Sequence, residues 1–481
     1  MTRDLTRFWI GGEWVEPLSG ERLDVEDPAT EEIVARIALG SAEDVDRAVA
    51  AAHAAQPGWA ATPVAERVAY LERLLEVTRR RLPELAEAIT TEMGAPHDVA
   101  LGEQAATAVG HLEGFLTALE DFPWEERLPN GETLWREPVG VAGLITPWNW
   151  PINQITLKVL PAIATGCACV LKPSELTPLS AMLYAEFLAE AGLPGGVVNL
   201  VNGTGPVVGA SLSGHSGIDM MSFTGSTRAG AQVSRDASES VKRVTLELGG
   251  KGPNLVFADC GAELEARVRA SVAEGMLNSG QSCDQPARMI VEASVYDEVC
   301  RIAAAAAEQT VVGDPRQPGD RIGPLAHGAQ WERVQGFITG AQAEGARLIA
   351  GGAGRPEGLA RGHYARPTIL ADVTPAMTIW REEVFGPVLT LTPFEGEDEG
   401  LRLANDTDYG LAAYLQTGDR DRALRVARGL RAGMVRVNGE AMGAGSPFGG
   451  MKRSGNGREG GRLGLEDFTE AKTLTLPPDW R

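Results

Sequence analysis

Three residues in this chain have side chains and local settings suited to chemistry. Cys283 ends the run NSGQSC (278–283), a polar turn containing glycine, where an exposed thiolate can attack an electrophile. Glu247 lies between two leucines at the end of a strand-like run, where desolvation raises a carboxyl pKa toward that of a useful base. Asn149, in TPWNWP (146–151), offers an amide donor for an oxyanion. Together they would supply a nucleophile, a base and an oxyanion donor.

Each of the three also has a purely structural interpretation. Most cysteines are inert, and no histidine lies near Cys283 in the sequence to act as its base. Glu247 is also explained as an outward-facing strand residue before a turn, and Asn149 as an amide that satisfies its own loop. From local sequence alone, both interpretations stay open.

Two glycine-containing segments are candidates for phosphate binding. The segment from Gly203 to Gly209 is one residue too long for GxGxxG. FTGSTRAG (223–230) follows a strand-like run and opens a helix, so the backbone at Gly225 and the Ser226 hydroxyl could receive a pyrophosphate at the positive helix end. An ordinary strand-to-helix turn fits equally well.

The elements that position these residues follow an α/β pattern. The first third has helical periodicity, with a capping box at residues 41–44. Five β-rich runs then alternate with helices from residue 141: VAGLIT, ACVLK, VVNLVN, IDMMSF and RVTLEL. Such alternation predicts a doubly wound parallel sheet with its ligand at the carboxyl ends of the strands. A second α/β stretch begins near residue 250, with strands expected at VEAS, RLIAGG, TILADV and MVRVN.

A two-stranded ribbon is expected around Asn130-Gly131, where both turn residues should have positive φ. This ribbon and the C-terminal run EDFTEAKTLTL have no obvious partner within the chain. We therefore expect an arm that needs another surface, such as that of a second subunit.

Composition excludes several classes of protein. The 481 residues carry a net charge of −21, which argues against binding to nucleic acid or to anionic membranes. We expect no transmembrane segment and no secretory signal, hence a cytoplasmic location. The five cysteines are an odd number, as is usual in a reducing compartment, and no spacing of cysteine or histidine predicts a metal site.

Taken together, the motifs resemble those of the NAD(P)-dependent aldehyde dehydrogenase superfamily over nearly the whole chain. The matching segments are PWNWP (147–151), KPSE (172–175), FTGSTRAG (223–230), LELGGK (246–251), GQSC (280–283), EEVFGPV (382–388), ANDTDYGLAA (404–413) and SPFGG (446–450). The resemblance implies a Rossmann-like NAD-binding domain (1–120 and 139–249), a second α/β catalytic domain (250–453) and a small β oligomerisation arm (121–138 and 466–481). Because an unpaired ribbon edge favours pairing with another chain, we expect a homodimer or homotetramer.

The resemblance assigns the catalytic roles. It implies that Cys283 attacks an aldehyde, and that the Asn149 amide and the Cys283 N–H hold the oxyanion. Hydride then passes to the nicotinamide, and water deprotonated by Glu247 hydrolyses the thioester to the acid. Transfer of the acyl group to coenzyme A is disfavoured because this base is present. The three intact groups also argue against a catalytically silent protein, and GHSG (214–217) is too short for the serine-hydrolase motif GxSxG.

The same resemblance assigns cofactor residues. Gly225 and Ser226 would meet the pyrophosphate, and Lys172 and Glu175 would hold the adenosine ribose. The nicotinamide end would be bordered by Glu383, which positions its ribose, and by Phe385. A carboxylate at Glu175 bonds a 2′-hydroxyl but repels a 2′-phosphate, so NAD is expected rather than NADP.

The substrate is expected to be a small aldehyde, aliphatic or a semialdehyde. The active-site turn and the SGNGRE tail resemble bacterial members that oxidise semialdehydes and oxo-acids from ring degradation. By motif position, the resemblance implies a substrate tunnel with a mixed polar and apolar wall. The residues expected to line it are Trp150, Gln154, Leu157, Ser282, Asp284, Met442 and Phe448. Asp284 departs from the neutral residue expected there. It either lines the tunnel and disfavours acidic substrates, or turns away to cap the following turn.

Overall fold

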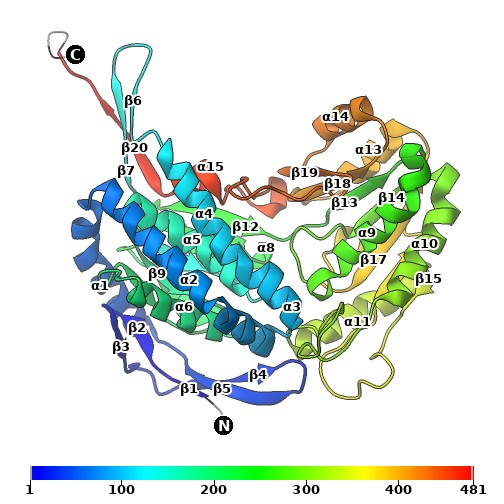
Figure 1. The fold of residues 1–481 in the computed structure, drawn as a ribbon, viewed down its shortest axis with the longest axis horizontal. Coiled ribbons are helices and arrows are strands. Elements are labelled where there is room, and N and C mark those ends of the chain that lie inside the picture. Colours follow the sequence, from blue (N-terminus) through cyan, green and yellow to red (C-terminus); the bar gives the residue numbers. More distant parts are fainter. Residues whose placement is uncertain (1–2, 478–479, 481) are drawn as a thin grey trace.

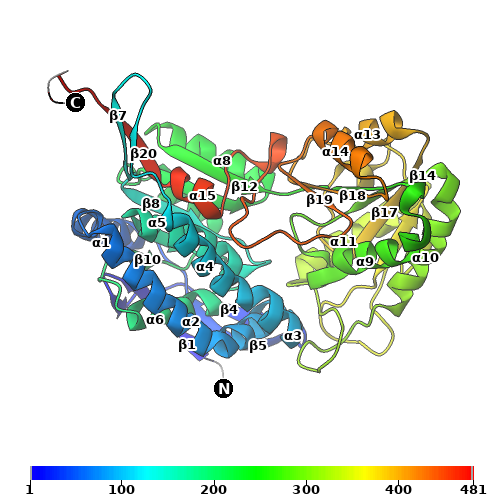
Figure 2. The same ribbon diagram turned by 45° about the horizontal axis from the view of Figure 1, so that its top comes forward.

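The computed structural model describes residues 3–477 and 480 and places them in two lobes and a projecting arm (Figure 1). The lobes remain distinct in the turned view (Figure 2). Each lobe is built around a seven-stranded sheet. No helix of the described residues is long and apolar enough to cross a membrane.

The first sheet confirms the predicted parallel arrangement. In sheet order its strands are β12 (Arg243–Leu248), β11 (Met220–Gly225), β8 (Val141–Ile145), β9 (Ala168–Lys172), β10 (Val198–Leu200), β2 (Phe8–Ile10) and β3 (Glu13–Val15). The first five are the predicted runs and are parallel, whereas β2 and β3 are antiparallel.

Helices cover both faces of this sheet because its strands are apolar on both sides. In β8, Val141 and Ile145 pack into one hydrophobic cluster, and Ala142 and Leu144 pack into the other. Fully burying one such leucine contributes about 1.5–3 kcal/mol. The helices of this lobe are α1 (Ala42–Ala60), α2 (Val64–Met93), α3 (His97–Val99), α4 (Ala106–Glu120), α5 (Pro151–Thr165), α6 (Leu179–Glu190), α7 (Ala210–Gly214), α8 (Thr227–Ser238) and α15 (Gly461–Asp467).

The second sheet has more strands than the sequence predicted. In sheet order they are β15 (Arg347–Ala350), β16 (Thr368–Ala371), β17 (Val388–Phe394), β14 (Arg288–Glu292), β13 (Pro253–Val256), β18 (Ala412–Gln416) and β19 (Met434–Val437). The expected strand at VEAS is the end of β14. The surrounding helices are α9 (Leu264–Met276), α10 (Tyr296–Gln309), α11 (Gly328–Ala343), α12 (Thr378–Arg381), α13 (Glu397–Asn405) and α14 (Arg420–Gly429).

The predicted helical first third is wrong for residues 3–38, which also form strands. A small sheet there consists of β1 (Arg3–Leu5), β5 (Glu32–Ala38) and β4 (Arg22–Asp27). Shorter 3₁₀ and π segments occupy Ala100–Ala105, Gly205–Gly209, Ala258–Glu263, Leu277–Gly280, Ala293–Val295 and Lys452–Ser454.

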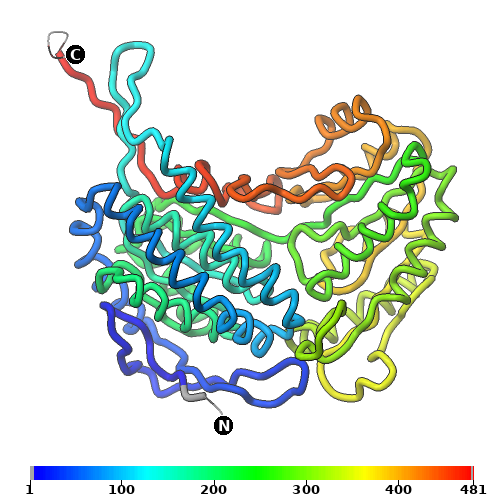
Figure 3. Tube along the Cα trace, viewed as in Figure 1, coloured from blue at the N-terminus to red at the C-terminus, as the bar shows by residue number. Residues whose placement is uncertain are grey.

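The arm is a three-stranded antiparallel sheet of β20 (Thr469–Leu474), β7 (Thr133–Pro138) and β6 (Glu125–Arg127). The chain returns from the second lobe to the first before β20 (Figure 3). The ribbon consists of β6 and β7, and the C-terminal strand β20 pairs with β7. The expectation that the ribbon and the C-terminal strand lack a partner in the chain is therefore wrong. In the turn only Gly131 has positive φ, while the Asn130 side chain accepts a hydrogen bond from the Glu132 N–H at 3.1 Å.

Candidate functional site

The candidate site lies where the strand order of the first sheet reverses. Successive strands β8, β9 and β10 extend to one side, and β11 and β12 lie on the other. Asn149 follows β8 and Gly225 ends β11, its neighbour. Open α/β sheets bind ligands in the crevice at such a switch point, beyond the carboxyl ends of the strands.

A cavity of about 290 Å³ occupies this crevice. Its wall includes six of the predicted site residues: Asn149, Gly225, Ser226, Cys283, Glu383 and Phe385. Cys283 and Glu383 come from the second lobe, so both lobes form the site. The structure thus brings together predicted catalytic and predicted cofactor residues.

Cys283 is presented by a turn with an unusual backbone. Asn278 and Ser279 have φ of 54° and 56°, a left-handed conformation that non-glycine residues adopt only when their surroundings enforce it. The Ser279 hydroxyl donates to the Gly323 carbonyl at 2.7 Å. A Cβ at Gly280 would lie 2.0 Å from the Gly386 carbonyl oxygen, so only glycine fits here.

The environment keeps the Cys283 thiol neutral. Burial raises its pKa well above the ordinary value, and the nearby charges of Asp284, Glu383 and Glu247 raise it further. A neutral thiol is a weak nucleophile, so attack on a substrate requires a base.

Asn149 is held in a position suited to stabilising an oxyanion. Its side-chain Nδ2 donates to the Gln281 carbonyl at 3.0 Å, which leaves the second N–H of that amide for another acceptor. Asn278 donates from Nδ2 to the Asn149 carbonyl at 2.9 Å and accepts at Oδ1 from Gln104 at 2.9 Å. The roles of Asn278 and Gln104 could not be predicted from the sequence, because the contact between them spans 174 residues.

Glu247 has the burial expected of a general base. Only 2% of the residue is exposed, and neither carboxyl oxygen has a hydrogen-bond partner among the described residues. Burial raises its pKa well above the usual range, with a further increase from the charge of Glu459 and a decrease from that of Lys158. A buried carboxylate without a partner is costly, which is typical of a group that meets its partner during the reaction.

Lys158 and Glu459 form a buried ion pair that the sequence analysis missed. The Lys158 Nζ donates to Glu459 Oε1 and, at 3.2 Å, to the Ser222 hydroxyl. The available signal was weak: a lysine within the apolar helix sequence PINQITLKVL.

The predicted adenosine-ribose residues form a pair outside the cavity wall. Lys172 ends β9, and its Nζ lies 3.1 Å from Glu175 Oε2 and 2.8 Å from the Pro173 carbonyl oxygen. Both residues lie at the carboxyl edge of the first sheet, as does Gly225.

The remaining residues predicted to bind the cofactor line the cavity. Ser226 caps α8 by accepting from the Ala229 N–H at 3.3 Å. Glu383 Oε1 accepts from the Gly250 N–H at 2.9 Å, and burial raises its pKa to about 7. Phe385 has a φ of 59° and its ring packs edge-on against Trp148 at 5.3 Å.

Two observations show that these residues fit a dinucleotide. The buried Thr224 hydroxyl lines the cavity without a partner among the described residues, next to Gly225 and the amino end of α8. A Cβ at Gly249 would lie 2.2 Å from a Glu383 carboxyl oxygen, so glycine leaves room for this carboxylate. The site therefore offers a helix N-terminus, a free hydroxyl and an acceptor carboxylate.

The predicted tunnel residues are only partly brought together. The Trp150 Nε1 donates to the Ser282 hydroxyl at 2.9 Å, beside Cys283. Cys283 and Phe448 pack against the same buried cluster, which contains Tyr414. The other predicted members are buried Gln154 and Leu157 on α5, and exposed Met442.

Asp284 is oriented by the second sheet. Its carbonyl accepts from the Tyr414 hydroxyl at 2.6 Å. Burial raises the pKa of its carboxyl group, and the nearby charge of Arg436 lowers it. Arg436 also forms an ion pair with Glu274, so one guanidinium faces two carboxylates.

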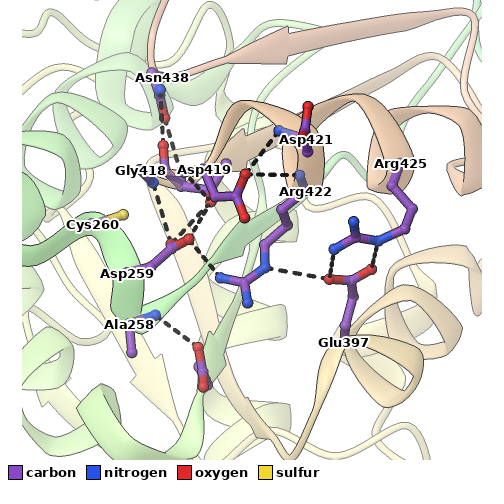
Figure 4. Close-up of polar contacts among 12 residues, drawn as sticks. Ala258, Asp259, Cys260, Glu397, Gly418, Asp419, Asp421, Arg422, Arg425 and Asn438 are labelled. Atoms are coloured by element: carbon purple, nitrogen blue, oxygen red, sulfur yellow. Dashed lines mark hydrogen bonds and ion pairs between the residues drawn. The ribbon is translucent and has the colours of Figure 1, made fainter.

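The carboxyl edge of the second sheet is occupied by its own polar contacts (Figure 4). Arg422 lies 2.6 Å from Asp259 and 3.3 Å from Glu397, which also pairs with Arg425 at 2.6 Å. Thr417 and the backbone of Gly418 donate to Asp259 as well. These groups satisfy one another, unlike the Thr224 hydroxyl and the Glu247 carboxyl group of the first site.

Comparison with known proteins agrees with this geometry. The model of the aldehyde dehydrogenase family matches residues 14–474. A 3-succinoylsemialdehyde-pyridine dehydrogenase from Pseudomonas sp is 50% identical, over 98% of both chains. Among solved structures, an aldehyde dehydrogenase from Bartonella henselae is 48% identical with a TM-score of 0.96, and covers 98% of this chain and 99% of its own. A mutant of aldehyde dehydrogenase C from Pseudomonas syringae, complexed with NAD+ and octanal, has the same identity and TM-score, with 98% and 96% covered.

Proposed function

The chain belongs to the aldehyde dehydrogenase family, and on this premise we propose that it oxidises an aldehyde to the carboxylic acid with NAD as hydride acceptor. One observation carries this proposal: Asn149 and Cys283 share one cavity wall, and the charge of Glu247 acts on the Cys283 sulfur. The test is NADH formation from a panel of aldehydes. Absence of NADH with every aldehyde would refute it.

In the first half-reaction Cys283 forms a covalent bond to the substrate. Its Sγ adds to the aldehyde carbon while the thiol proton passes to water in the cavity. The oxygen becomes an oxyanion, held by the second N–H of Asn149 and by the Cys283 N–H. The chemistry that the cofactor supplies is acceptance of hydride from this carbon, which leaves a thioester on Cys283.

In the second half-reaction Glu247 activates water. The carboxylate removes one proton, and the hydroxide adds to the thioester carbon. The C–S bond then breaks, so that the acid leaves and the cysteine sulfur takes up a proton again. The unpartnered carboxyl oxygens of Glu247 provide acceptors for this water.

Cofactor preference follows from Glu175. We assign the adenosine ribose to Lys172 and Glu175, the pyrophosphate to Gly225 and Ser226, and the nicotinamide end to Glu383 and Phe385. A Glu175 carboxylate accepts from a ribose hydroxyl and repels a phosphate, which favours NAD. Equal kcat/KM with NAD and NADP would contradict this assignment.

For the substrate, we propose a neutral or cationic aldehyde, either aliphatic or a semialdehyde without a free carboxylate, in a tunnel lined by the predicted residues from Trp150 to Phe448. The support is charge: the charge of Asp284 raises the pKa of the Cys283 thiol, and Arg436, which lowers the pKa of Asp284, is already paired with Glu274. The names of the relatives from Pseudomonas, with a pyridine semialdehyde and with octanal, agree with substrates of this kind.

The substrate proposal is tested with the substitution Asp284→Asn. We expect it to lower KM for a short aldehyde bearing an ω-carboxylate and to leave KM for the neutral analogue unchanged, because only the former is repelled. The same KM for both substrates in wild type and variant would show that Asp284 does not select substrate charge.

We further propose a homodimer or homotetramer in the cytoplasm. The outer strands of the arm, β20 and β6, have unpaired edges within the described residues, and such edges favour pairing with another chain. All five cysteines are free, as expected in a reducing compartment.

A further inference from the structure

A buried carboxylate outside the catalytic cavity makes an unusual set of contacts. Glu92, in the last turn of α2, is 1% exposed. It accepts hydrogen bonds from the Leu179 N–H at 2.5 Å, from the Ser180 N–H at 3.1 Å and from the Ser180 hydroxyl at 2.5 Å. All three donors belong to the first turn of α6, which packs beside α2 (Figure 1).

These contacts supply a cap that α6 lacks in its own sequence. The residue before the helix is Pro178, whose side chain makes no capping hydrogen bond. The N–H groups of a first helical turn need acceptors, and the helix dipole favours a negative charge there. Glu92 meets both needs from a different helix. Burial raises its pKa to about 7, and the three hydrogen bonds act in the opposite direction.

The capped turn is joined directly to the segment that carries Glu175. Residues 173–178 connect β9 to α6, with a proline at each end. Within this segment Ser174 accepts from the Leu176 N–H through its hydroxyl and from the Thr177 N–H through its carbonyl, both at 3.2 Å. The segment is stiff, so its position depends on its two ends: β9 on one side and the first turn of α6 on the other.

We propose that Glu92 is a positioning residue for cofactor binding, which fixes the first turn of α6 and thereby the adenosine-ribose segment at Glu175. This inference rests on the proposed function, because that proposal assigns Lys172 and Glu175 to the ribose. It predicts that loss of the Glu92 carboxylate weakens binding of the adenosine half of the cofactor and spares the chemistry at Cys283.

The experiment compares four variants of the full-length protein. Glu92→Gln removes the negative charge and presents an N–H₂ group to donors, and Ser180→Ala removes one donor only. Tyr70→Phe is the matched control: Tyr70 also lies on α2, and its hydroxyl donates to the Leu188 carbonyl at 3.0 Å, at the opposite end of α6. Glu175→Gln tests the ribose assignment itself.

Binding is measured by titration calorimetry with ADP-ribose, which contains the adenosine ribose and lacks nicotinamide. We expect Glu92→Gln to raise Kd about tenfold, and Ser180→Ala to raise it less, since a tenfold change corresponds to the loss of one charge-assisted contact. Tyr70→Phe should lower Tm without changing Kd. In steady state, Glu92→Gln should raise KM for NAD and leave kcat at saturating NAD within about twofold of wild type.

The outcomes separate the two proposals. If Glu175→Gln weakens ADP-ribose binding and Glu92→Gln does not, the inference about Glu92 fails and the proposed site stands. If Glu175→Gln has no effect, the ribose assignment fails and the inference with it. If Tyr70→Phe weakens binding as much as Glu92→Gln, the effect reflects general α2–α6 packing and the inference is wrong. If Glu92→Gln does not fold, the Kd of Ser180→Ala for ADP-ribose is compared with the values for Glu175→Gln and Tyr70→Phe in the same way.

Discussion

At the scale of single residues, the site is dominated by negative charge around a sulfur atom. Burial raises the pKa of the Cys283 thiol, and the charges of Asp284, Glu383 and Glu247 raise it further, so the resting nucleophile is protonated. Catalysis therefore depends on transfer of the thiol proton and on stabilising a further negative charge on the substrate oxygen. Cys283 forms the covalent bond, Asn149 stabilises the oxyanion and Glu247 activates water for the later hydrolysis, and each role can be tested alone.

Cys283→Ala should abolish aldehyde oxidation and leave NAD binding within about threefold of wild type, because the thiol forms the covalent bond but only borders the cofactor. NADH production and calorimetric NAD binding are the two measurements. Appreciable turnover in this variant would exclude a cysteine mechanism.

Glu247→Gln should form NADH in a rapid burst and then stall, because hydride transfer precedes the step that needs the base to activate water. Stopped-flow absorbance distinguishes the burst from the steady rate. Loss of the burst together with slow turnover would assign Glu247 to activation of Cys283 instead.

Glu459→Gln should shift the acid limb of the pH–rate profile to lower pH. Glu247 must be ionised to act, and it ionises as pH rises through its raised pKa. The negative charge of Glu459 contributes to that raised pKa, so removing the charge lowers it. The check is thioester hydrolysis in single turnover across pH. Glu466→Gln, in α15 and paired with Arg462 at 2.9 Å, serves as a control that should not shift the limb.

At the scale of elements, the sequence predicted best where local pattern and tertiary structure agree. The strands β8 to β12 are apolar runs bounded by helices, and all were predicted. Strand β4 has the sequence RLDVED and exposes alternate charged residues, so it lacks the apolar run on which the prediction relied. The ion pair whose charges act on Glu247 was missed for another reason: Lys158 and Glu459 are 301 residues apart, and no local pattern encodes such a contact.

The turn before Cys283 gives a prediction at this scale. Asn278→Ala should destabilise the protein by about 1–3 kcal/mol, because it removes buried hydrogen bonds and keeps a β-carbon in a left-handed conformation. It should also lower kcat more than it raises KM, since Asn149 loses the contact to its carbonyl. Denaturant unfolding and steady-state kinetics measure the two effects.

Asn278→Gly is the matched variant for that turn. The glycine variant loses the same hydrogen bonds, but glycine adopts positive φ freely. Its free energy of unfolding should therefore be about 1 kcal/mol higher than that of the alanine variant. Equal stability of the two variants would show that the left-handed backbone stores no strain.

At the scale of the whole molecule, the arm is the feature that the proposed oligomer depends on. We expect light scattering to report a dimer or tetramer at micromolar concentration. Removal of the residues after Phe468 should shift the protein to smaller species, because β7 then loses its longer partner strand. A stable monomer for the intact chain would refute the oligomer, and an unchanged mass after truncation would show that the arm is not its interface.

The arm is built from segments that lie far apart in the sequence, and this affects when a newly made chain can assemble. Its central strand β7 is synthesised long before β20, and the contact from Thr475 to Glu132 joins residues 343 apart. Closing so long a loop is slow and must await emergence of β20 from the ribosome. A subunit therefore cannot present its complete arm before β20 has been made, so a chain truncated before β20 would lack one edge strand of the arm and could not pair with another subunit through it.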